Sequence, residues 1–180
     1  MAKRTISVSK RRHEARRYAR ELTQKIYDYS SYIASVNVPT IRIGADGSGT
    51  FFLPDRASFE QSRPYSPTSG IVFQDGSFLT VKEIFRYGYI NETDAEPQIA
   101  RLEFSYHYQN PYRQFFFRYD HHPQIGDPAT HPRYHLHVGC WHPSNTKLPS
   151  TPRFRVPEVT LEEVLELIVR DFLTPETEAE

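Results

Sequence analysis

Five of the chain's eight histidines lie between residues 118 and 139, in the stretch RYDHHPQIGDPATHPRYHLHVG. The imidazole group has an ordinary pKa of about 6.5, so a histidine can exchange protons at neutral pH or bind a metal ion. His135 and His137 are the strongest candidates, because side chains two residues apart on a β-strand project from the same face. Such a pair can serve as the general acid and the general base of one reaction.

The same histidines permit two other interpretations. A His-x-His strand can supply two ligands of a zinc site, to which His121, His122 or His131 would add a third. The imidazoles can also form a polar strand face that only meets water. The residue types alone leave all three interpretations open.

Arg118 and Asp120 stand just before the histidines. An arginine beside an acid–base pair can bind a phosphate group through two parallel hydrogen bonds and stabilise charge that builds up on it. Asp120 can fix the tautomer of a neighbouring histidine. Alternatively, the two side chains form an ordinary cross-strand ion pair, worth at most about 1 kcal/mol. His107 and Glu103 are weaker candidates, since such residues are common on polar strand faces.

Strand periodicity predicts how these residues come together. Residues 100–109, 114–120 and 134–139 alternate apolar and polar side chains, as half-buried strands do. The apolar positions are expected to form one side of a sheet, packed against a C-terminal helix, and neither His135 nor His137 is expected in the core. The closest packing against that helix is predicted at Phe104, Phe117 and Leu136. The apolar set is Leu102, Phe104, Tyr106, Phe115, Phe117, Tyr119, Tyr134, Leu136 and Val138, and the opposite set is Glu103, Ser105, His107, Arg118, Asp120, His135 and His137.

The two ends of the chain carry opposite charge, although the formal net charge is zero. Residues 1–25 contain nine Lys or Arg against two Glu, and residues 158–180 contain eight acidic residues against one Arg. Apolar residues at three- and four-residue steps predict an amphipathic helix from Ser9 to about Ile33. Its basic side could follow the phosphate backbone of RNA or dock on an acidic partner. The RNA-binding candidates on it are Arg11, Arg12, Arg16, Arg17 and Arg20.

Local signals predict the remaining elements. GADGSG separates two short strands, of which the first contains Pro39 at an edge or an interruption. Asp75 and Gly76 predict a hairpin turn, and Thr160 with Glu163 predicts a capping box that opens a helix. We therefore expect an α+β fold, with an antiparallel β-sheet of roughly four to six strands, a C-terminal helix packed on one face and a basic N-terminal helix. Three parts are expected: residues 1–70 (helix, small hairpin and linker), residues 71–173 (the α+β domain) and the acidic tail 174–180.

Composition excludes several classes of protein. Cys140 is the single cysteine, so an intrachain disulfide and a cysteine-based zinc site are excluded. No stretch approaches about 18 consecutive apolar residues, so no membrane span is predicted. The basic N-terminus lacks the apolar segment of a secretory signal. A cytoplasmic protein is expected.

The second half of the chain resembles the TumE-type toxins of bacterial and archaeal toxin–antitoxin pairs. The resemblance spans roughly residues 72–173 and follows the order of the family motifs: a Tyr-His-Tyr strand, an Arg-Tyr-Asp-Asn-x-Pro segment, a Pro-His-His-x-His-Val segment and a closing Leu-Glu-Glu-Val helix. In this chain His121 stands in place of the Asn, and Arg133 and Tyr134 follow Pro132. The matching positions are Tyr106, His107, Tyr108, Arg118, Tyr119, Asp120, Pro123, His135, His137, Val138 and residues 161–165.

This resemblance implies a small toxin that acts on RNA and has a cognate antitoxin protein as partner. Together with the histidine pair, it favours a metal-independent ribonuclease without a cofactor. In that hypothesis His135 and His137 act as acid and base, Arg118 binds phosphate and Asp120 orients a histidine. The alternatives are a non-enzymatic RNA-binding or protein-interaction module and a metal-dependent hydrolase with histidine ligands. A homo-oligomer stays open.

Overall fold

The computed structural model describes residues 5–54, 70–91, 93–123, 131–140 and 151–174 of the 180-residue chain. Helix α1 (Val8–Asp28) comes first and helix α3 (Leu161–Ile168) comes last. The short turns η1 (Ser30–Tyr32, a 3-10 turn) and η2 (Val169–Leu173, a π turn) follow them. The strands are β1 (Ile33–Val36), β2 (Thr40–Ile43), β3 (Ser48–Leu53), β4 (Ile71–Phe73), β5 (Phe78–Gly88), β6 (Gln98–Asn110), β7 (Phe115–His121), β8 (Tyr134–Cys140) and β9 (Phe154–Arg155).

The strands of the described residues join one antiparallel sheet of nine strands. Its order is β1-β4-β5-β6-β7-β8-β9, and the β2–β3 hairpin attaches to β5 through β3. The sheet is larger than predicted, because β1, β2 and β3 of the N-terminal part pair into it and β9 adds a short edge. The α+β class with its N-terminal and C-terminal helices is confirmed.

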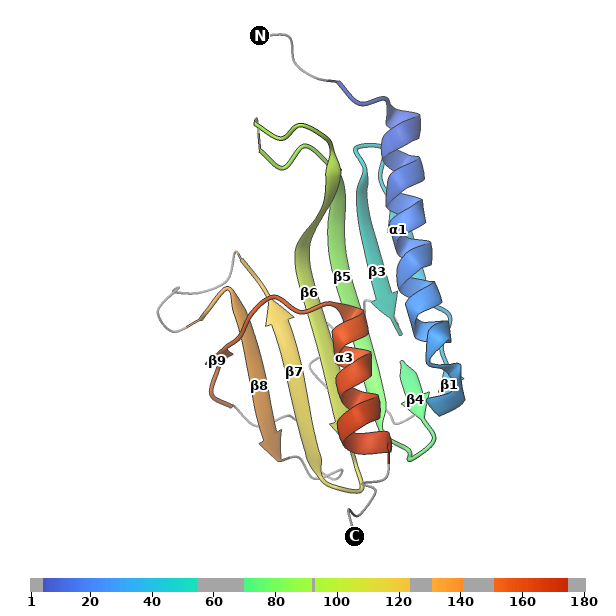
Figure 1. The fold of residues 1–180 in the computed structure, drawn as a ribbon, viewed down its shortest axis with the longest axis vertical. Helices are drawn as coiled ribbons and strands as arrows, with labels where there is room; N and C mark the ends of the chain where they lie inside the picture. The colour runs from blue at the N-terminus through green and yellow to red at the C-terminus, as the bar shows by residue number, and fades with distance from the viewer. Residues whose placement is uncertain (1–4, 55–69, 92, 124–130, 141–150, 175–180) are drawn as a thin grey trace.

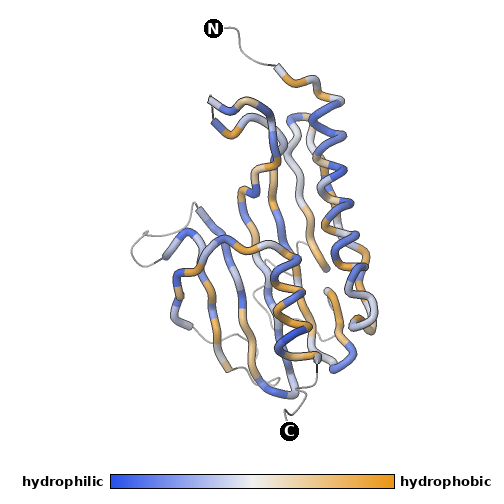
Figure 2. Tube along the Cα trace, viewed as in Figure 1, coloured by the Kyte–Doolittle hydropathy of each residue, from blue (hydrophilic) through white to orange (hydrophobic). Residues whose placement is uncertain are grey.

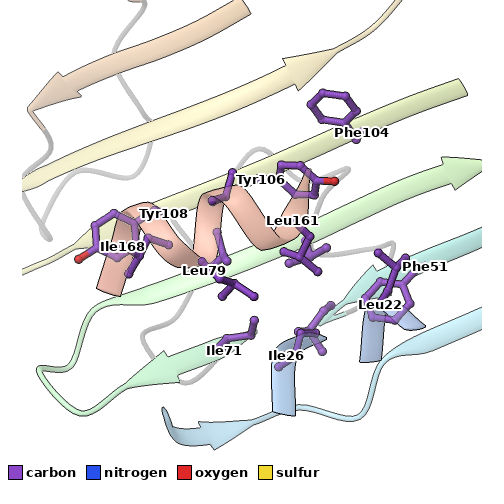
Figure 3. Packing of buried hydrophobic residues seen from close by; sticks show 14 of the residues in the cluster. Leu22, Ile26, Phe51, Ile71, Leu79, Phe104, Tyr106, Tyr108, Leu161 and Ile168 are labelled. Carbon is purple, nitrogen blue, oxygen red and sulfur yellow. The ribbon is translucent and has the colours of Figure 1, made fainter. Parts of the chain in front are cut away.

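Both helices pack on the same face of this sheet (Figure 1). Figure 3 shows Leu161 and Ile168 of α3 beside Leu79 and Tyr108 of the sheet, and Leu22 of α1 beside Phe51, all in one buried cluster. The predicted core residues Phe104, Phe117, Val164 and Leu165 are buried in the same cluster. The helices therefore cover one face and leave the other face to the polar strand positions.

The helix ends follow local sequence signals. The hydroxyl of Ser7 accepts a hydrogen bond from the backbone N–H of Lys10 and so caps α1. The predicted capping box is confirmed at α3, where Thr160 and Glu163 bond each other's backbone N–H. α1 ends earlier than predicted, because η1 turns the chain and Ile33 already begins β1. Figure 2 shows the alternation of hydrophilic and hydrophobic residues along α1 that its half-buried position requires. None of the described helices is long and apolar enough to cross a lipid bilayer.

Turn residues fix the strand connections in the N-terminal half of the sheet. Pro39 interrupts the first predicted strand, so that β1 ends at Val36 and β2 begins at Thr40. The predicted turn at Asp75 and Gly76 joins β4 to β5, with Gly76 at φ +78°. This left-handed backbone conformation favours glycine, which has no Cβ.

Two departures from strand alternation correct the predicted apolar face. Ile84 pairs with Glu103 whereas Phe85 pairs with Arg101, so a β-bulge removes Leu102 from the register and leaves it 37% exposed. On β8, Leu136 is only half-buried and Val138 is exposed. This strand lies to the side of α3 (Figure 1), so the helix cannot cover it. The predicted burial of Leu136 beneath α3 is therefore wrong.

A buried carboxyl group ties α1 to the central strands. Tyr18 of α1 donates its hydroxyl to Glu83 Oε2 at 2.7 Å, and Tyr106 of β6 donates to Oε1 of the same group. Arg101 in turn donates to the hydroxyl oxygen of Tyr106 at 3.3 Å. Burial raises the pKa of Glu83 despite these hydrogen bonds. The network fixes β6 from the helix-covered side, opposite the candidate site residues.

Candidate active site opposite the helices

Three neighbouring strands bring the predicted site residues to the face opposite the helices. Directly paired residues of antiparallel strands point to the same face, with Cβ atoms about 5 Å apart. Two successive rows of such pairs cross β6, β7 and β8. The first row is Ser105, Asp120 and His135, and the second row is His107, Arg118 and His137.

These rows line a hollow of about 180 Å³, called here the histidine hollow. The four predicted catalytic residues, His135, His137, Arg118 and Asp120, all belong to its lining. The complete lining is Lys82, Ser105, His107, Arg118, Asp120, His122, His131, His135, His137 and Arg153.

Asp120 lies at the centre of the histidine hollow, and its side chain is only 2% exposed. Arg118 Nε donates a hydrogen bond to Asp120 Oδ2 at 2.7 Å. The same oxygen lies 3.5 Å from His137 Nε2 and 3.8 Å from His135 Nε2. Arg118 is therefore the close partner of this carboxylate, and both imidazoles face it from slightly beyond normal hydrogen-bond distance.

The other ring nitrogen of each histidine has its own partner. His135 Nδ1 lies 2.8 Å from the carbonyl oxygen of Pro132. A carbonyl only accepts hydrogen bonds, so Nδ1 carries the proton and Nε2 carries a lone pair when the ring is neutral. His137 Nδ1 lies 3.0 Å from the hydroxyl of Thr151. These contacts hold both rings with Nε2 turned toward Asp120.

The two histidines are far more buried than predicted. Only 1% of His135 and 6% of His137 is exposed, so the expectation that both lie outside the core is wrong. Their ring centroids are 5.0 Å apart, and the ring of His131 lies 4.4 Å from that of His135, so the rings cover one another. Burial lowers the pKa of His135, and it lowers the pKa of His137 to about 4 with help from the charge of Arg118. Both imidazoles are therefore neutral at pH 7 in this structure.

His122 differs from these two because it lies between carboxylates. Its Nδ1 is 2.8 Å from Glu103 Oε1, and its Nε2 is 3.7 Å from Asp120 Oδ1. Burial alone would lower its pKa, but Asp120 and Glu103 outweigh burial and raise the pKa to about 9. His122 is consequently a charged imidazolium at pH 7.

The walls of the histidine hollow are rich in positive charge. Lys82, Arg118, Arg153 and the charged His122 all line it. Burial would raise the pKa of Asp120, but His122 and Arg118 outweigh it and hold that pKa well below its usual range. Glu103 pairs with Lys82 and His122 at the rim, so four cationic groups face two carboxylates, and the remaining excess of positive charge favours a bound anion.

The structure separates the neighbours His121 and His122. His121 pairs with Phe104 and lies on the helix-covered face, where its ring is 4.5 Å from that of Tyr134. His121 therefore cannot be the third zinc ligand suggested by the sequence. His122 and His131 do reach the hollow.

Sequence reasoning underrated some wall residues and missed others. His107, a weak candidate by sequence, lies in the second row because the Tyr-His-Tyr alternation carries it there. Lys82 comes from β5, whose register against β6 no sequence pattern gives. Thr151 and Arg153 lie in a Pro-rich segment without periodicity, so no signal pointed to them.

The arginines of α1 are not part of the histidine hollow. Arg12, Arg16 and Arg20 line a separate groove of about 640 Å³ beside Ile41 of β2, on the helix-covered side. Arg17 instead forms ion pairs with Glu14 and Glu21 on its own helix. Arg11 lies against Gly47, at the β2–β3 turn. The structure thus places these five arginines on the opposite face of the sheet from the histidine hollow.

Asp120, His135 and His137 also have the donor set of a zinc site. One ligand atom from each lies within 4.8 Å of the others. The backbone and hydroxyl partners of the two Nδ1 atoms are of the kind that orient metal-bound histidines. Against this, Arg118 already occupies Asp120 Oδ2, and the cationic walls repel a metal ion. The donor atoms fit a metal, whereas the surrounding charge fits an anion better.

Comparison with models of known protein families gives a match over most of the chain. The model of a family described as Toxin TumE matches residues 51–172, more than half of the chain. The matched range contains β6, β7 and β8 and thus both rows of the histidine hollow. α1 lies outside it. No curated protein and no solved structure matches the chain.

Proposed function

The chain belongs to the TumE toxin family and is therefore a toxin of a toxin–antitoxin system; from this premise we propose that it is a metal-independent endoribonuclease. The acid–base pair of this proposal is His135 and His137. The observation that carries it is the convergence of two oriented imidazoles, a buried carboxylate and an arginine in one cation-lined hollow. Such a hollow suits the phosphodiester of RNA, which is an anion and carries a neighbouring 2′-hydroxyl.

The proposed reaction is attack of the 2′-oxygen on the adjacent phosphorus. One histidine takes the proton of the 2′-hydroxyl through Nε2 while the new P–O bond forms. The bond from phosphorus to the 5′-oxygen breaks, and the other histidine gives that oxygen a proton. The products are a 2′,3′-cyclic phosphate and a 5′-hydroxyl, so no water, oxidant or metal ion is consumed.

Arg118 and Asp120 have supporting roles in this proposal. The Arg118 guanidinium lies on the second row beside His137, where it can bind the phosphate and stabilise the charge that grows on it. Asp120 keeps Arg118 in place and stabilises whichever imidazole becomes charged. A bound phosphate adds negative charge near the pair and raises the pKa of both rings, so that one of them holds a proton in the complex.

Incubation of the pure protein with total RNA, with and without a chelator, tests the proposal. Cleavage that survives the chelator and leaves cyclic phosphate ends is expected. RNA that stays intact under all conditions would favour the rival, a non-enzymatic RNA-binding or protein-interaction module.

A second candidate function is a metal-dependent hydrolase, favoured by the ligand distances of Asp120, His135 and His137. If the protein binds zinc in stoichiometric amount and loses both zinc and cleavage with the chelator, this candidate replaces the first. Cleavage that leaves 3′-hydroxyl and 5′-phosphate ends would point the same way, because a metal-activated water then attacks phosphorus.

The partners follow from the family and from this reaction. A cognate antitoxin protein is implied by membership of the family. RNA is the proposed substrate, and the arginines of α1 are proposed as additional phosphate contacts. Both partners fit action in the cytoplasm.

A further inference from the structure

A second hollow lies on the same face of the sheet as the histidine hollow. Its volume is about 300 Å³, and it is formed by the β2–β3 hairpin. It is called here the hairpin hollow. Its lining is Thr40, Arg42, Ile43, Gly44, Ser48, Gly49, Thr50 and Phe52.

The two hollows adjoin through one pair of residues. Lys82 of the histidine hollow pairs directly with Phe52 of the hairpin hollow, across β5 and β3. Beyond Phe52 the same row reaches Thr40, and on the other side it reaches Asp120 through Ser105. With neighbouring strands about 4.8 Å apart, the four steps from Thr40 to Asp120 span roughly 19 Å. A ligand that runs across the strands can therefore occupy both hollows at once.

The hairpin hollow offers a cation and hydroxyl groups. Arg42 is exposed, and its guanidinium has no ion pair with any other residue that the structure describes. Thr50 Oγ1 is buried without a hydrogen-bond partner among these residues. Thr40 adds a second hydroxyl. A guanidinium and a hydroxyl that lack partners among the described residues suit a phosphate and its sugar, since both provide hydrogen-bonding oxygens.

We propose that the hairpin hollow binds a nucleotide of the RNA strand whose scissile phosphate lies in the histidine hollow. This inference rests on the proposed ribonuclease function. It adds the path of the substrate: the RNA strand runs across the sheet from β8 toward β2. Arg42 binds the phosphate of the distant nucleotide, and Thr50 with Thr40 binds its sugar or base edge.

The position of β2 supports an extended ligand rather than a second small molecule. β2 pairs only with β3 among the described strands and is therefore an edge. Ile41, between Thr40 and Arg42, faces the other side and lines the arginine groove of α1. An RNA strand that leaves the hairpin hollow past Arg42 can pass around the β2 edge of the sheet. It then reaches Arg12 and the other arginines of the α1 groove. The proposed substrate is thus single-stranded RNA several nucleotides long.

The test measures binding separately from cleavage. His137→Ala protein, which should not cut RNA, is titrated with labelled oligouridylates of about 12 and about 2 nucleotides, because a span of roughly 19 Å needs about six stacked nucleotides and a dinucleotide cannot cover it even when extended. Adding Arg42→Gln should weaken binding of the long RNA about tenfold, as expected for one charged hydrogen bond, and should lower the salt slope by about 0.7. Binding of the short RNA should change less than about twofold by the same reasoning. Arg170→Gln is the matched control, because Arg170 is exposed and pairs with Asp171 on η2.

The outcomes separate this inference from the function on which it rests. Equal affinity of the long RNA with and without Arg42 would overturn the hairpin hollow as a nucleotide site, even if the wild-type protein cleaves RNA. Loss of antitoxin binding instead of RNA binding in the Arg42→Gln protein would overturn it as well. If the Arg42 effect on long RNA is present but wild-type protein cuts no RNA, the hairpin hollow stands as an RNA-binding site and the ribonuclease proposal fails.

Discussion

Along β8, both histidines are more deeply buried than Leu136, which separates them. Polar side chains are usually the exposed ones on a strand of this kind. The imidazoles tolerate burial because each Nδ1 has a hydrogen-bond partner, while each Nε2 faces Asp120. Titratable groups whose pKa is displaced by burial cluster at functional sites, which is consistent with a catalytic role for this pair.

The first prediction concerns the loss of either histidine. His135→Ala and His137→Ala should each lower RNA cleavage by about 10²–10⁴-fold and abolish growth inhibition in cells. Because both side chains are buried, each change should also cost about 1–3 kcal/mol of unfolding free energy.

The control for this prediction is His121→Ala. It removes an equally buried imidazole from the opposite face of the same part of the sheet. It should lose stability but keep cleavage, measured at a temperature at which all variants are folded. Full activity of the His135 and His137 variants would reject the site, and equal inactivity of the His121 variant would attribute the losses to folding.

The second prediction concerns pH. The base must be neutral, which for His137 holds above a pKa of about 4. The acid must be protonated, which holds only below its own pKa, and burial lowers the pKa of His135 as well. The pH profile of kcat/KM depends on the pKa values of the free enzyme. This bell-shaped profile should therefore peak on the acidic side of neutrality. The bell for kcat should peak at higher pH, because the bound phosphate raises both pKa values.

RNA cleavage rates are measured at a series of pH values, and the stability of the protein is checked at each. These rates give the pH profiles of kcat/KM and of kcat. A kcat/KM that stays constant from neutral pH to about pH 9 would contradict the pair as acid and base. It would transfer the acid role to a group that is already protonated, such as His122, whose pKa is about 9.

At the scale of elements, strand alternation predicts the residues that β6, β7 and β8 contribute to the histidine hollow, but not the rest of its lining. Asp120, His135 and His137 meet because period-two alternation holds without interruption in β7 and β8. The alternation fails at Leu102 because β6 has a bulge there. The bulge depends on the pairing with β5, and no residue pattern in the sequence predicts it. Lys82 was missed for the same reason, since register between distant strands is set by the whole sheet.

The burial of the site was also beyond sequence reasoning. A polar face is read as solvent-exposed unless the segments packed on it are known. Thr151 and Arg153 come from a Pro-rich stretch whose position relative to β8 depends on the short pairing of β9.

The third prediction belongs to α1. Arg12, Arg16 and Arg20 recur at four-residue steps and line one groove, whereas Arg17 is neutralised by Glu14 and Glu21. If the groove binds the backbone of single-stranded RNA, replacing the three groove arginines by glutamine should flatten the log–log salt slope of RNA affinity by up to about 2. Arg17→Gln should leave the slope nearly unchanged. A slope that does not respond to the triple substitution would assign the groove to a protein partner, and antitoxin affinity measured on the same variants would then show the loss.

At the scale of the whole molecule, the two faces of the sheet differ in the side chains that they carry. One face carries the apolar core beneath α1 and α3, and the other carries the two adjoining polar hollows. Buried histidines occur on both faces, since His121 lies in the core side and His107 and His137 lie in the hollow. Their folded-state pKa values are lowered by burial, to about 4 for His121 and His137 and about 3 for His107. The stability of the fold is therefore linked to pH up to about 6.5, above the range in which ordinary carboxylates titrate.

The sign of this linkage follows from proton binding. Between about pH 6.5 and pH 4 the unfolded chain protonates these histidines and the folded chain does not, so the free energy of unfolding falls as the pH is lowered. His122 acts in the opposite sense, because its pKa is raised to about 9. Its contribution is complete below about pH 6.5 and is lost as the pH rises through about 9. Stability should accordingly be highest near neutral pH.

The last prediction isolates one of these groups without touching the histidine hollow. His121 is 1% exposed, packs against Tyr134 and Phe104, and accepts a hydrogen bond from Arg133 Nε at 3.2 Å. His121→Phe preserves an aromatic ring in the core but removes a proton-binding group. Below about pH 6.5 the free energy of unfolding of this variant should fall less steeply than that of the wild type, by up to about 1.4 kcal/mol per pH unit. Chemical denaturation at several pH values between 4.5 and 7.5, spaced within roughly this window, measures the slope. Parallel curves for the two proteins would mean that His121 binds its proton equally well in the folded and the unfolded chain, and the acid sensitivity would then have to come from the histidines of the opposite face.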